Sequence, residues 1–547
     1  RVRRQRQMCI RDRALTLCIT LAGASMDLFA CTNLLVTSGA SADGSTYITY
    51  AVDSHEFYGE LIPTPARIHR EGAMREVREW DTGEFLGRIP QPRETYSVIG
   101  HMNEYQVAIG ETTFGGREEL EEGNGIIDYG SLMFIALERA KTARGAIKVM
   151  TELVAEFGYA SSGESFSISD PHEAWILEMI SKGPEKLGAV WVARLVPDGY
   201  ISGHANQARI RQFPLNKPKT TLYAPDVIDF AREMGWYEGE DSDFSFADTY
   251  APLDFGALRF CEARVWSLFR RAAPSADLPF ELVKGDVIEE RLPLWIKPDE
   301  KLTTEQVFGL MRDHYEDTPL DMRNDVGAGP YACPYRWRPM TWELGEETYV
   351  HERAISTQQT GHSFVAQSRS WLPDSIGGVL WFGLDDTFLT VYTPMYCGIN
   401  DVPPSYGPGV ASMWEFSWDS AFWVFNWVSN QVYSRYSDMV VDVQGVQNEL
   451  EGAFLQRQAE IEATALELHK QDPGMARKHL TDYSVAAGEH VTKRWRSLGE
   501  QLLVKYIDGN VKNEKREADH PRYPDNWYQR IVDERGEEIR QPRTEEE

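Results

Sequence analysis

The hydrophobic pattern that follows residue 30 predicts a β-hairpin. The segments 31–37 (CTNLLVT) and 46–52 (TYITYAV) are short, mostly apolar and β-branched runs, and a turn-forming stretch, SGASADGS, separates them. Partners across an antiparallel hairpin without a bulge keep a constant sum of residue numbers. The position of the turn puts Cys31 opposite Val52. We therefore expect the carboxylate of Asp53 to lie within a residue or two of Cys31.

The rest of the pattern predicts blocks of strands with helices between and after them. Helical periodicity marks 131–143 and 146–157, with Gly145 between them. The strands are expected at 165–169, 174–180, 190–196, 200–210, 354–370 and 378–392, and the later helices at 304–315, 448–470 and 486–506. Strands and helices that are segregated in this way indicate an α+β layered protein.

The first thirty residues differ from everything that follows. Residues 1–13 carry six Arg and one Asp, and an apolar run at 14–24 precedes the small residue Ala30. This order is typical of a secretory signal peptide, and the run is too short to span a bilayer. Cleavage after Ala30 would make Cys31 the first residue of an exported protein, in the periplasm or the medium. A start at Met26 would instead leave a short pro-segment and no export.

The charge balance limits the partners. The chain has 84 Asp and Glu against 56 Lys and Arg, a formal net charge of −28. An acidic surface repels phosphate backbones, so nucleic acid is not an expected partner. No later stretch is long and uncharged enough to cross a membrane. Whether the protein forms a homo-oligomer stays open.

The cysteines do not indicate a metal site. Of six, Cys9 and Cys18 precede the expected cleavage, and no Cys-x-x-Cys pair occurs. No His pair at helical spacing around a Glu is present either, so neither a metal nor another cofactor is expected. Cys261, Cys333 and Cys397 are left as buried free thiols or with one disulfide among them.

Cys31 acquires a second role if it becomes N-terminal. A thiol with a pKa near 8.5 is only partly ionised at neutral pH, and an adjacent base raises the thiolate fraction. The α-amino group has an ordinary pKa of about 7.7–8, so one residue would supply both nucleophile and base. Asp53 could hold that amine by a charge-assisted hydrogen bond, or could simply cap a strand end. The alternatives for Cys31 are an ordinary buried residue or the acylated cysteine of a lipoprotein, because Leu-Phe-Ala before it partly fits a lipobox.

Several short motifs occur in a fixed order along the chain. They are CTNLLV at 31–36 with DGST at 43–46, YAVDSH at 50–55, IGETTFGG at 109–116, VPDGYISGHANQARI at 196–210, GPYACPYR at 329–336 and ISTQQTG at 355–361. In this order the chain resembles the PepD-like dipeptidases, a family of cysteine-type N-terminal-nucleophile hydrolases. The resemblance extends over most of residues 31 to about 507.

The resemblance implies a four-layer αββα sandwich, here with a helical C-terminal extension, and hydrolysis of dipeptides. It places the nucleophile at Cys31, the supporting carboxylate at Asp53 and an oxyanion-hole donor at Asn206. A side-chain amide can stabilise a tetrahedral oxyanion, whereas the alternative for Asn206 is a turn residue that bonds its own backbone. Some relatives carry an Arg two residues before this Asp, where this chain has Ala51.

Four further residues are candidates for contacts with a peptide substrate. His204 and Arg209 flank Asn206, and Arg209 could bind a substrate carboxylate as a bidentate pair. Glu111 and Thr112 lie in another matching motif and could line the pocket. His204 and Arg209 could equally be structural partners within the protein.

The sequence leaves three possible functions and predicts one division into domains. The first function is an exported dipeptidase that forms an acyl-enzyme on Cys31. The second is a related amidase of the penicillin-acylase or bile-salt-hydrolase type, which would not require a free substrate α-amine. The third is a ligand-binding lipoprotein without catalysis. We expect residues 1–30 to be removed, 31–440 to form the hydrolase domain and 441–547 to form a helical region with a charged tail.

Overall fold

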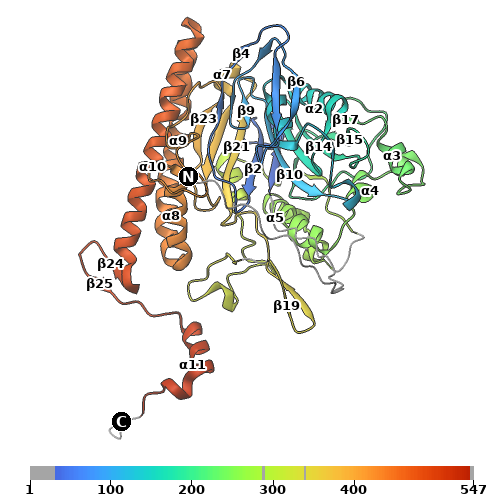
Figure 1. Ribbon diagram of the computed structural model, residues 1–547. Coiled ribbons are helices and arrows are strands. Elements are labelled where there is room, and N and C mark those ends of the chain that lie inside the picture. Colours follow the sequence, from blue (N-terminus) through green and yellow to red (C-terminus); the bar gives the residue numbers. More distant parts are fainter. Residues whose placement is uncertain (1–30, 286–289, 338–339, 543–547) are drawn as a thin grey trace, which may run out of the picture.

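The computed structural model describes residues 31–285, 290–337 and 340–542, so the predicted signal segment 1–30 lies outside the described residues. Two large antiparallel sheets form its centre (Figure 1). In spatial order, the first sheet contains β18 (Trp295–Ile296), β16 (Ile201–His204), β1 (Asn33–Val36), β2 (Thr46–Asp53), β21 (Thr360–Ser368), β22 (Val379–Leu384) and β23 (Thr393–Tyr396). The second contains β17 (Thr221–Tyr223), β15 (Ala189–Leu195), β14 (Ala174–Ser181), β13 (Gly163–Ser169), β10 (Ala108–Gly115), β9 (Met102–Asn103), β8 (Val98–Ile99) and β3 (Pro63–Thr64).

The predicted hairpin is present with the predicted register. Leu35 faces Ile48, and Thr32 faces Ala51, so both pairs keep the expected sum of residue numbers. The hairpin lies in the middle of the first sheet, where every residue of β1 and β2 is buried. Its position fixes the segment around Cys31 between β16 and β2.

The second sheet is covered on both faces. Alternate residues of β14 divide between two cores: Trp175, Leu177 and Met179 pack with α1 (Tyr129–Leu137) and α2 (Ala143–Phe157). The intervening residues of β14 pack toward the first sheet instead. A strand that alternates between two apolar layers has no solvent-facing side, which explains its near-continuous hydrophobic sequence.

Helices from the second half of the chain cover the first sheet. α8 (Ala421–Ser434), α9 (Tyr436–Gln471) and α10 (Pro473–Tyr506) contact β22 and β23, and Figure 1 shows the two long helices side by side along this edge of the molecule. α5 (Ala263–Ala272) packs against β16. The expected boundary at residue 440 therefore falls inside α9, whose residues pack on the same sheet that holds Cys31.

Smaller elements complete the described chain. The short helices are α3 (Val227–Glu233), α4 (Phe246–Tyr250), α6 (Thr304–Met311) and α7 (Asp374–Gly377). Two-stranded pairs are β4 (Arg67–Ile68) with β7 (Glu94–Thr95), β5 (Met74–Arg78) with β6 (Phe85–Pro90), β11 (Asn124–Gly125) with β12 (Gly158–Tyr159), β19 (Thr341–Leu344) with β20 (Glu347–Val350), and β24 (Val511–Lys512) with β25 (Ala518–Asp519). The last helix, α11 (Asp525–Ile539), buries no residue. Among the described residues, no helix combines the length and the apolar character that crossing a membrane requires.

The α+β class is confirmed, but several element boundaries were predicted wrongly, and two of them have a clear physical reason. Gly145 does not separate two helices but lies in the first turn of α2, where its N–H donates to the capping Thr142 hydroxyl at 3.0 Å. The strand expected at 200–210 ends at His204. Beyond it, the N–H groups of Arg209 and Ile210 donate to the buried carboxylate of Glu178 instead of a neighbouring strand.

Candidate active site

Cys31 lies two residues before Asn33, the first residue of β1, and is 2% exposed. Its backbone nitrogen donates to Oδ1 of Asn206 at 2.9 Å. Its Sγ lies 3.8 Å from both Oη of Tyr50 and Oε1 of Glu111. Both the nitrogen and the sulfur of Cys31 are thus held by buried polar side chains, which brings together three segments that are far apart in the sequence.

Asn206 follows β16 in the left-handed region, with φ 57°. Asn tolerates this conformation better than most residues do. Its Nδ2 donates to the carbonyl of Thr113 on β10 at 2.6 Å, while its Oδ1 accepts from Cys31. An amide nitrogen has two hydrogens, so Nδ2 retains one donor beyond the contact with Thr113.

Arg264 of α5 is a member of the site that the sequence reasoning missed. Its guanidinium is fully buried and donates to the carbonyl of Cys31 at 2.7 Å, to Oγ1 of Thr32 at 2.9 Å and to Oδ1 of Asn206 at 2.9 Å. The guanidinium presents several N–H donors in a fixed planar arrangement, so it can bind oxygens that lie close together. No motif marks Arg264 in the sequence, since it follows Cys31 by more than two hundred residues.

Asp53 ends β2 at a bulge, where Val52 pairs with His362 but Asp53 pairs with Thr360. Its carboxylate is fully buried and accepts from Oγ1 of Thr360 at 2.7 Å, and Nη2 of Arg353 lies 3.9 Å from it. The predicted proximity of Asp53 to Cys31 is reflected in two opposing effects on the pKa of the thiol.

Several groups act in opposite directions on the pKa of the Cys31 thiol. Burial raises the pKa of the thiol well above its ordinary value, and the charges of Glu111 and Asp53 raise it further. Hydrogen bonds from the backbone of Asp53 and the side chain of Tyr50 act in the opposite direction. The thiol therefore rests protonated at neutral pH, and attack by its sulfur requires a base to take the proton.

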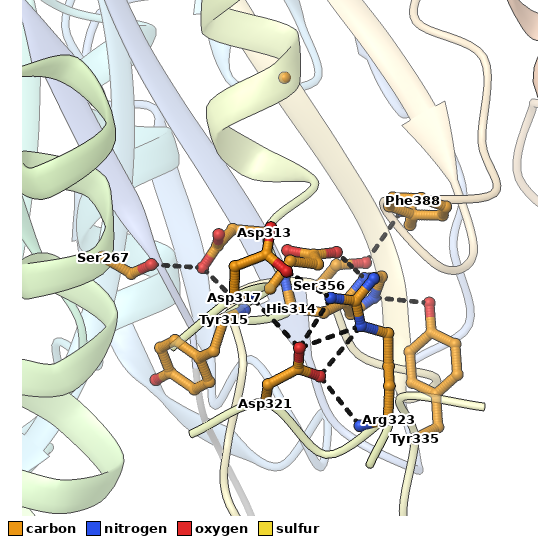
Figure 2. A network of polar contacts seen from close by, with 12 residues as sticks. Ser267, Asp313, His314, Tyr315, Asp317, Asp321, Arg323, Tyr335, Ser356 and Phe388 are labelled. Carbon is orange, nitrogen blue, oxygen red and sulfur yellow. Dashed lines mark hydrogen bonds and ion pairs between the residues drawn. The ribbon is translucent and has the colours of Figure 1, made fainter. Parts of the chain in front are cut away.

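The segment that carries Arg353 and Thr360 is anchored by a separate polar network, which we call the Asp313 network (Figure 2). It consists of Ser267, Asp313, His314, Tyr315, Asp317, Asp321, Arg323, Tyr335, Ser356 and Phe388 with their polar partners. Oη of Tyr315 donates to the carbonyl of Arg353 at 2.6 Å, and the N–H of Ser356 donates to the carbonyl of Asp313 at 3.1 Å. The network thus holds the loop that contacts Asp53.

His204 and Thr112 link the two sheets. Nδ1 of His204 lies 2.8 Å from Oγ1 of Thr112, and Nε2 lies 2.8 Å from Oγ of Ser167. Burial, with a smaller effect of the charge of Arg209, lowers the pKa of His204 to about 3, so its imidazole is neutral. These contacts favour the structural alternative for His204.

Arg209 is also enclosed by the protein. Its guanidinium pairs with Glu262 at 2.8 Å and donates to the carbonyls of Gly203 and Pro293 at 2.7 and 2.8 Å. The side chains of Arg209 and Glu262 are 2% and 3% exposed. The structural alternative is favoured here as well, and substrate contact by either residue stays a prediction.

A cavity of about 120 Å³ adjoins the site. Aromatic rings and imidazoles form much of its wall, among them Tyr50, Trp80, His101, Tyr129, Phe134 and His362. Burial lowers the pKa of His101 to about 4 and that of His362 to about 3, so these rings are neutral. Because Tyr50 belongs both to this wall and to the contacts of Cys31, the cavity offers room for a substrate next to the thiol.

The cysteines among the described residues form no disulfide. Cys31, Cys261, Cys333 and Cys397 are all free thiols. Within the part of the chain that the structure describes, no group of three or more His, Cys, Asp or Glu side chains is arranged to hold a metal ion.

Comparison with known proteins gives a consistent result. The chain is 27% identical over 417 residues to a probable dipeptidase of Salmonella dublin, covering 72% of this chain and 87% of that protein. It is 25% identical over 431 residues to a probable dipeptidase of Latilactobacillus sakei, covering 75% and 82%, and 21% identical over 500 residues to dipeptidase A of Lactobacillus helveticus, covering 87% and 96%.

The chain also matches the sequence pattern of a peptidase family. Residues 61–449, most of the chain, match Peptidase family C69. The matched range begins after Cys31 and Asp53, so the roles of these two residues rest on the geometry described above. The resemblance inferred from the short motifs is confirmed: this chain belongs to Peptidase family C69.

Proposed function

We propose that this chain is an exported cysteine dipeptidase that works through an acyl-enzyme on an N-terminal Cys31. The observation that carries the proposal is the convergence of Asn206, Arg264 and Glu111 on the nitrogen, carbonyl and sulfur of one cysteine. Membership of a peptidase family and likeness to proteins named as dipeptidases support the reaction class. Two stacked sheets between helical layers are what an αββα sandwich of N-terminal-nucleophile hydrolases requires.

Cleavage after Ala30 would convert the backbone nitrogen of Cys31 into an α-amine. The amine takes the thiol proton, and the sulfur attacks the carbonyl carbon of the peptide bond. Asp53 supports the amine in its charged form. Arg264 holds the Cys31 carbonyl, so the residue keeps one orientation while its nitrogen and sulfur change protonation.

Asn206 has a role in the next step. The free hydrogen of its Nδ2 can donate to the oxyanion of the tetrahedral intermediate, while Oδ1 keeps the Cys31 nitrogen in place. Breakdown of the intermediate breaks the C–N bond, and the leaving amine receives the proton from the α-ammonium. Water then attacks the thioester with the α-amine as base, which releases the first amino acid and restores the thiol.

The decisive experiment combines the state of the N-terminus with removal of the thiol. Intact mass and N-terminal peptide mapping of the exported protein should give a chain that begins at an unmodified Cys31. Cys31→Ala should lower kcat/KM for dipeptides by at least about 10³-fold, because the nucleophile is lost. A diacylglyceryl group on Cys31, a retained Ala30 or undiminished hydrolysis by the variant would each refute the mechanism.

A further inference from the structure

A pair of buried glutamates beside Cys31 has no use in the mechanism above. Glu111 on β10 and Glu164 on β13 are diagonal neighbours on one face of the second sheet, because Thr113 pairs with Glu164 and Glu111 lies two residues before it. Their side chains are 2% and 1% exposed. Glu111 accepts from Tyr50, and Glu164 accepts from Oγ1 of Thr113 at 2.9 Å.

Each glutamate keeps one buried oxygen, Oε2, that accepts no hydrogen bond from any donor outside the pair in the described part of the chain. The two side chains hydrogen-bond to each other, which requires that they share one proton. The charged groups that act on Glu164 are also acids, namely Glu111 and Asp81. Two adjacent buried carboxylates are unfavourable unless a proton or a cation neutralises them. Accordingly, burial and the neighbouring Glu111 raise the pKa of Glu164 well above its ordinary value.

The position of the pair relative to the thiol indicates which cation belongs there. Oε1 of Glu111 lies 3.8 Å from Sγ of Cys31. In a productive complex, the attacked carbonyl carbon lies about 3–3.5 Å from the sulfur. The α-nitrogen of a dipeptide is two bonds of roughly 1.5 Å beyond that carbon, so it falls within reach of a carboxylate next to the sulfur.

The neighbouring cavity is consistent with an ammonium group at this point. Tyr50 and Tyr129 belong to its wall, and Oη of Tyr129 donates to Asp81 at 3.0 Å. Aromatic faces attract cations, and Asp81 adds a third carboxyl group. Tyr50 connects the cavity with the pair, because it lines the cavity and donates to Glu111.

We propose that Glu111 and Glu164 bind the α-ammonium of the substrate, so that the enzyme selects peptides with a free N-terminal amine. This inference rests on the proposed dipeptidase function. It makes the second glutamate, which does not contact the thiol, a determinant of specificity.

The test compares a dipeptide with its des-amino analogue, in which hydrogen replaces the α-amine and nothing else changes. Wild-type enzyme should prefer the dipeptide by about 10²-fold or more in kcat/KM, because the analogue leaves the buried carboxylates unpaired. Glu164→Gln should reduce this preference to less than about tenfold. Glu164→Asp, which keeps the charge, should retain most of it. Glu173→Gln, at the other end of the same sheet and paired with Arg144, is the matched control.

The outcomes separate this inference from the proposed function. An unchanged preference in Glu164→Gln, or an equal loss of activity on both substrates, would overturn the amine site and leave the dipeptidase intact. Equal cleavage of both substrates by the wild type would do the same. Absence of any peptide hydrolysis by the wild type would refute the function itself and, with it, the inference.

Discussion

Two buried polar regions of this protein differ in how their carboxylates are neutralised. In the Asp313 network (Figure 2), Asp313 accepts from Ser267 at 2.6 Å and from Arg271 at 3.1 Å, and Asp321 pairs with Arg323 at 2.7 Å. Beside Cys31, Glu111 and Glu164 face hydroxyl groups and each other. The carboxylates of the first region are paired with arginines, whereas among the described residues no cationic side chain neutralises Glu111 or Glu164 in the second.

The pKa values follow the same division. Burial alone would raise the pKa of Glu316, next to the Asp313 network, but hydrogen bonds and the charge of His314 lower it to about 2. At Glu164, burial and Glu111 act together and raise the pKa. A buried carboxylate that is paired with a cation contributes to the stability of the fold. A buried carboxylate without such a partner lowers the stability and is available to a ligand.

Asn206 should give the largest effect in the region beside Cys31, because the remaining hydrogen of its Nδ2 is the proposed oxyanion donor. Asn206→Ala should lower kcat by roughly 10²–10³-fold through loss of the oxyanion donor. Steady-state kinetics on a dipeptide measure the effect. Asn206→Asp keeps the acceptor for Cys31 but removes the Nδ2 donor, so it should also lose kcat. An unchanged kcat in both variants would remove Asn206 from the mechanism.

Asp313→Asn should have the next largest effect, this time on stability. Removing the charge leaves Arg271 without its buried partner, and we expect the free energy of unfolding to fall by about 2–3 kcal/mol, less than for a fully buried pair because Arg271 is one-third exposed. Urea denaturation of the wild type and the variant gives the value.

Glu164→Gln is the variant to compare with Asp313→Asn in the same urea denaturation experiment. The raised pKa means that folded protein holds a proton on Glu164 more tightly than unfolded protein does, so its contribution to stability is lost as the pH rises above the ordinary Glu range. Because Gln does not titrate, the variant should become more stable than the wild type as the pH increases. A loss of stability as large as that of Asp313→Asn would contradict the distinction between the two regions.

The smallest expected effect is the change that Glu111→Gln makes in the titration of Cys31 in the enzyme without substrate. Removing a neighbouring negative charge should lower the pKa of the thiol and move its titration to lower pH. The pH dependence of alkylation of Cys31 by iodoacetamide measures it, with Glu173→Gln as control. An alkylation midpoint that stays in place or moves upward would show that Glu111 does not act on the thiol.

Local pattern predicted the parts of the fold that depend on neighbouring residues. The hairpin register was correct because strand pairing across a short turn is fixed by the turn itself, and Asp53 was correctly expected near Cys31. The strand expected at 200–210 was too long, because the carboxylate that captures the backbone at Arg209 and Ile210 comes from another strand.

The sequence by itself determined the α+β class, the hairpin and, through its ordered motifs, the peptidase family. It also identified Cys31, Asp53, Asn206 and Glu111 as candidates, but not their partners. Only the tertiary structure brought Arg264 to Cys31 and Glu164 to Glu111, and enclosed His204 and Arg209 in the core. The physical reason is that the pairing of charges and their burial arise where two sheets and a distant helix pack together. The sequence pattern does not indicate which side chains then face one another.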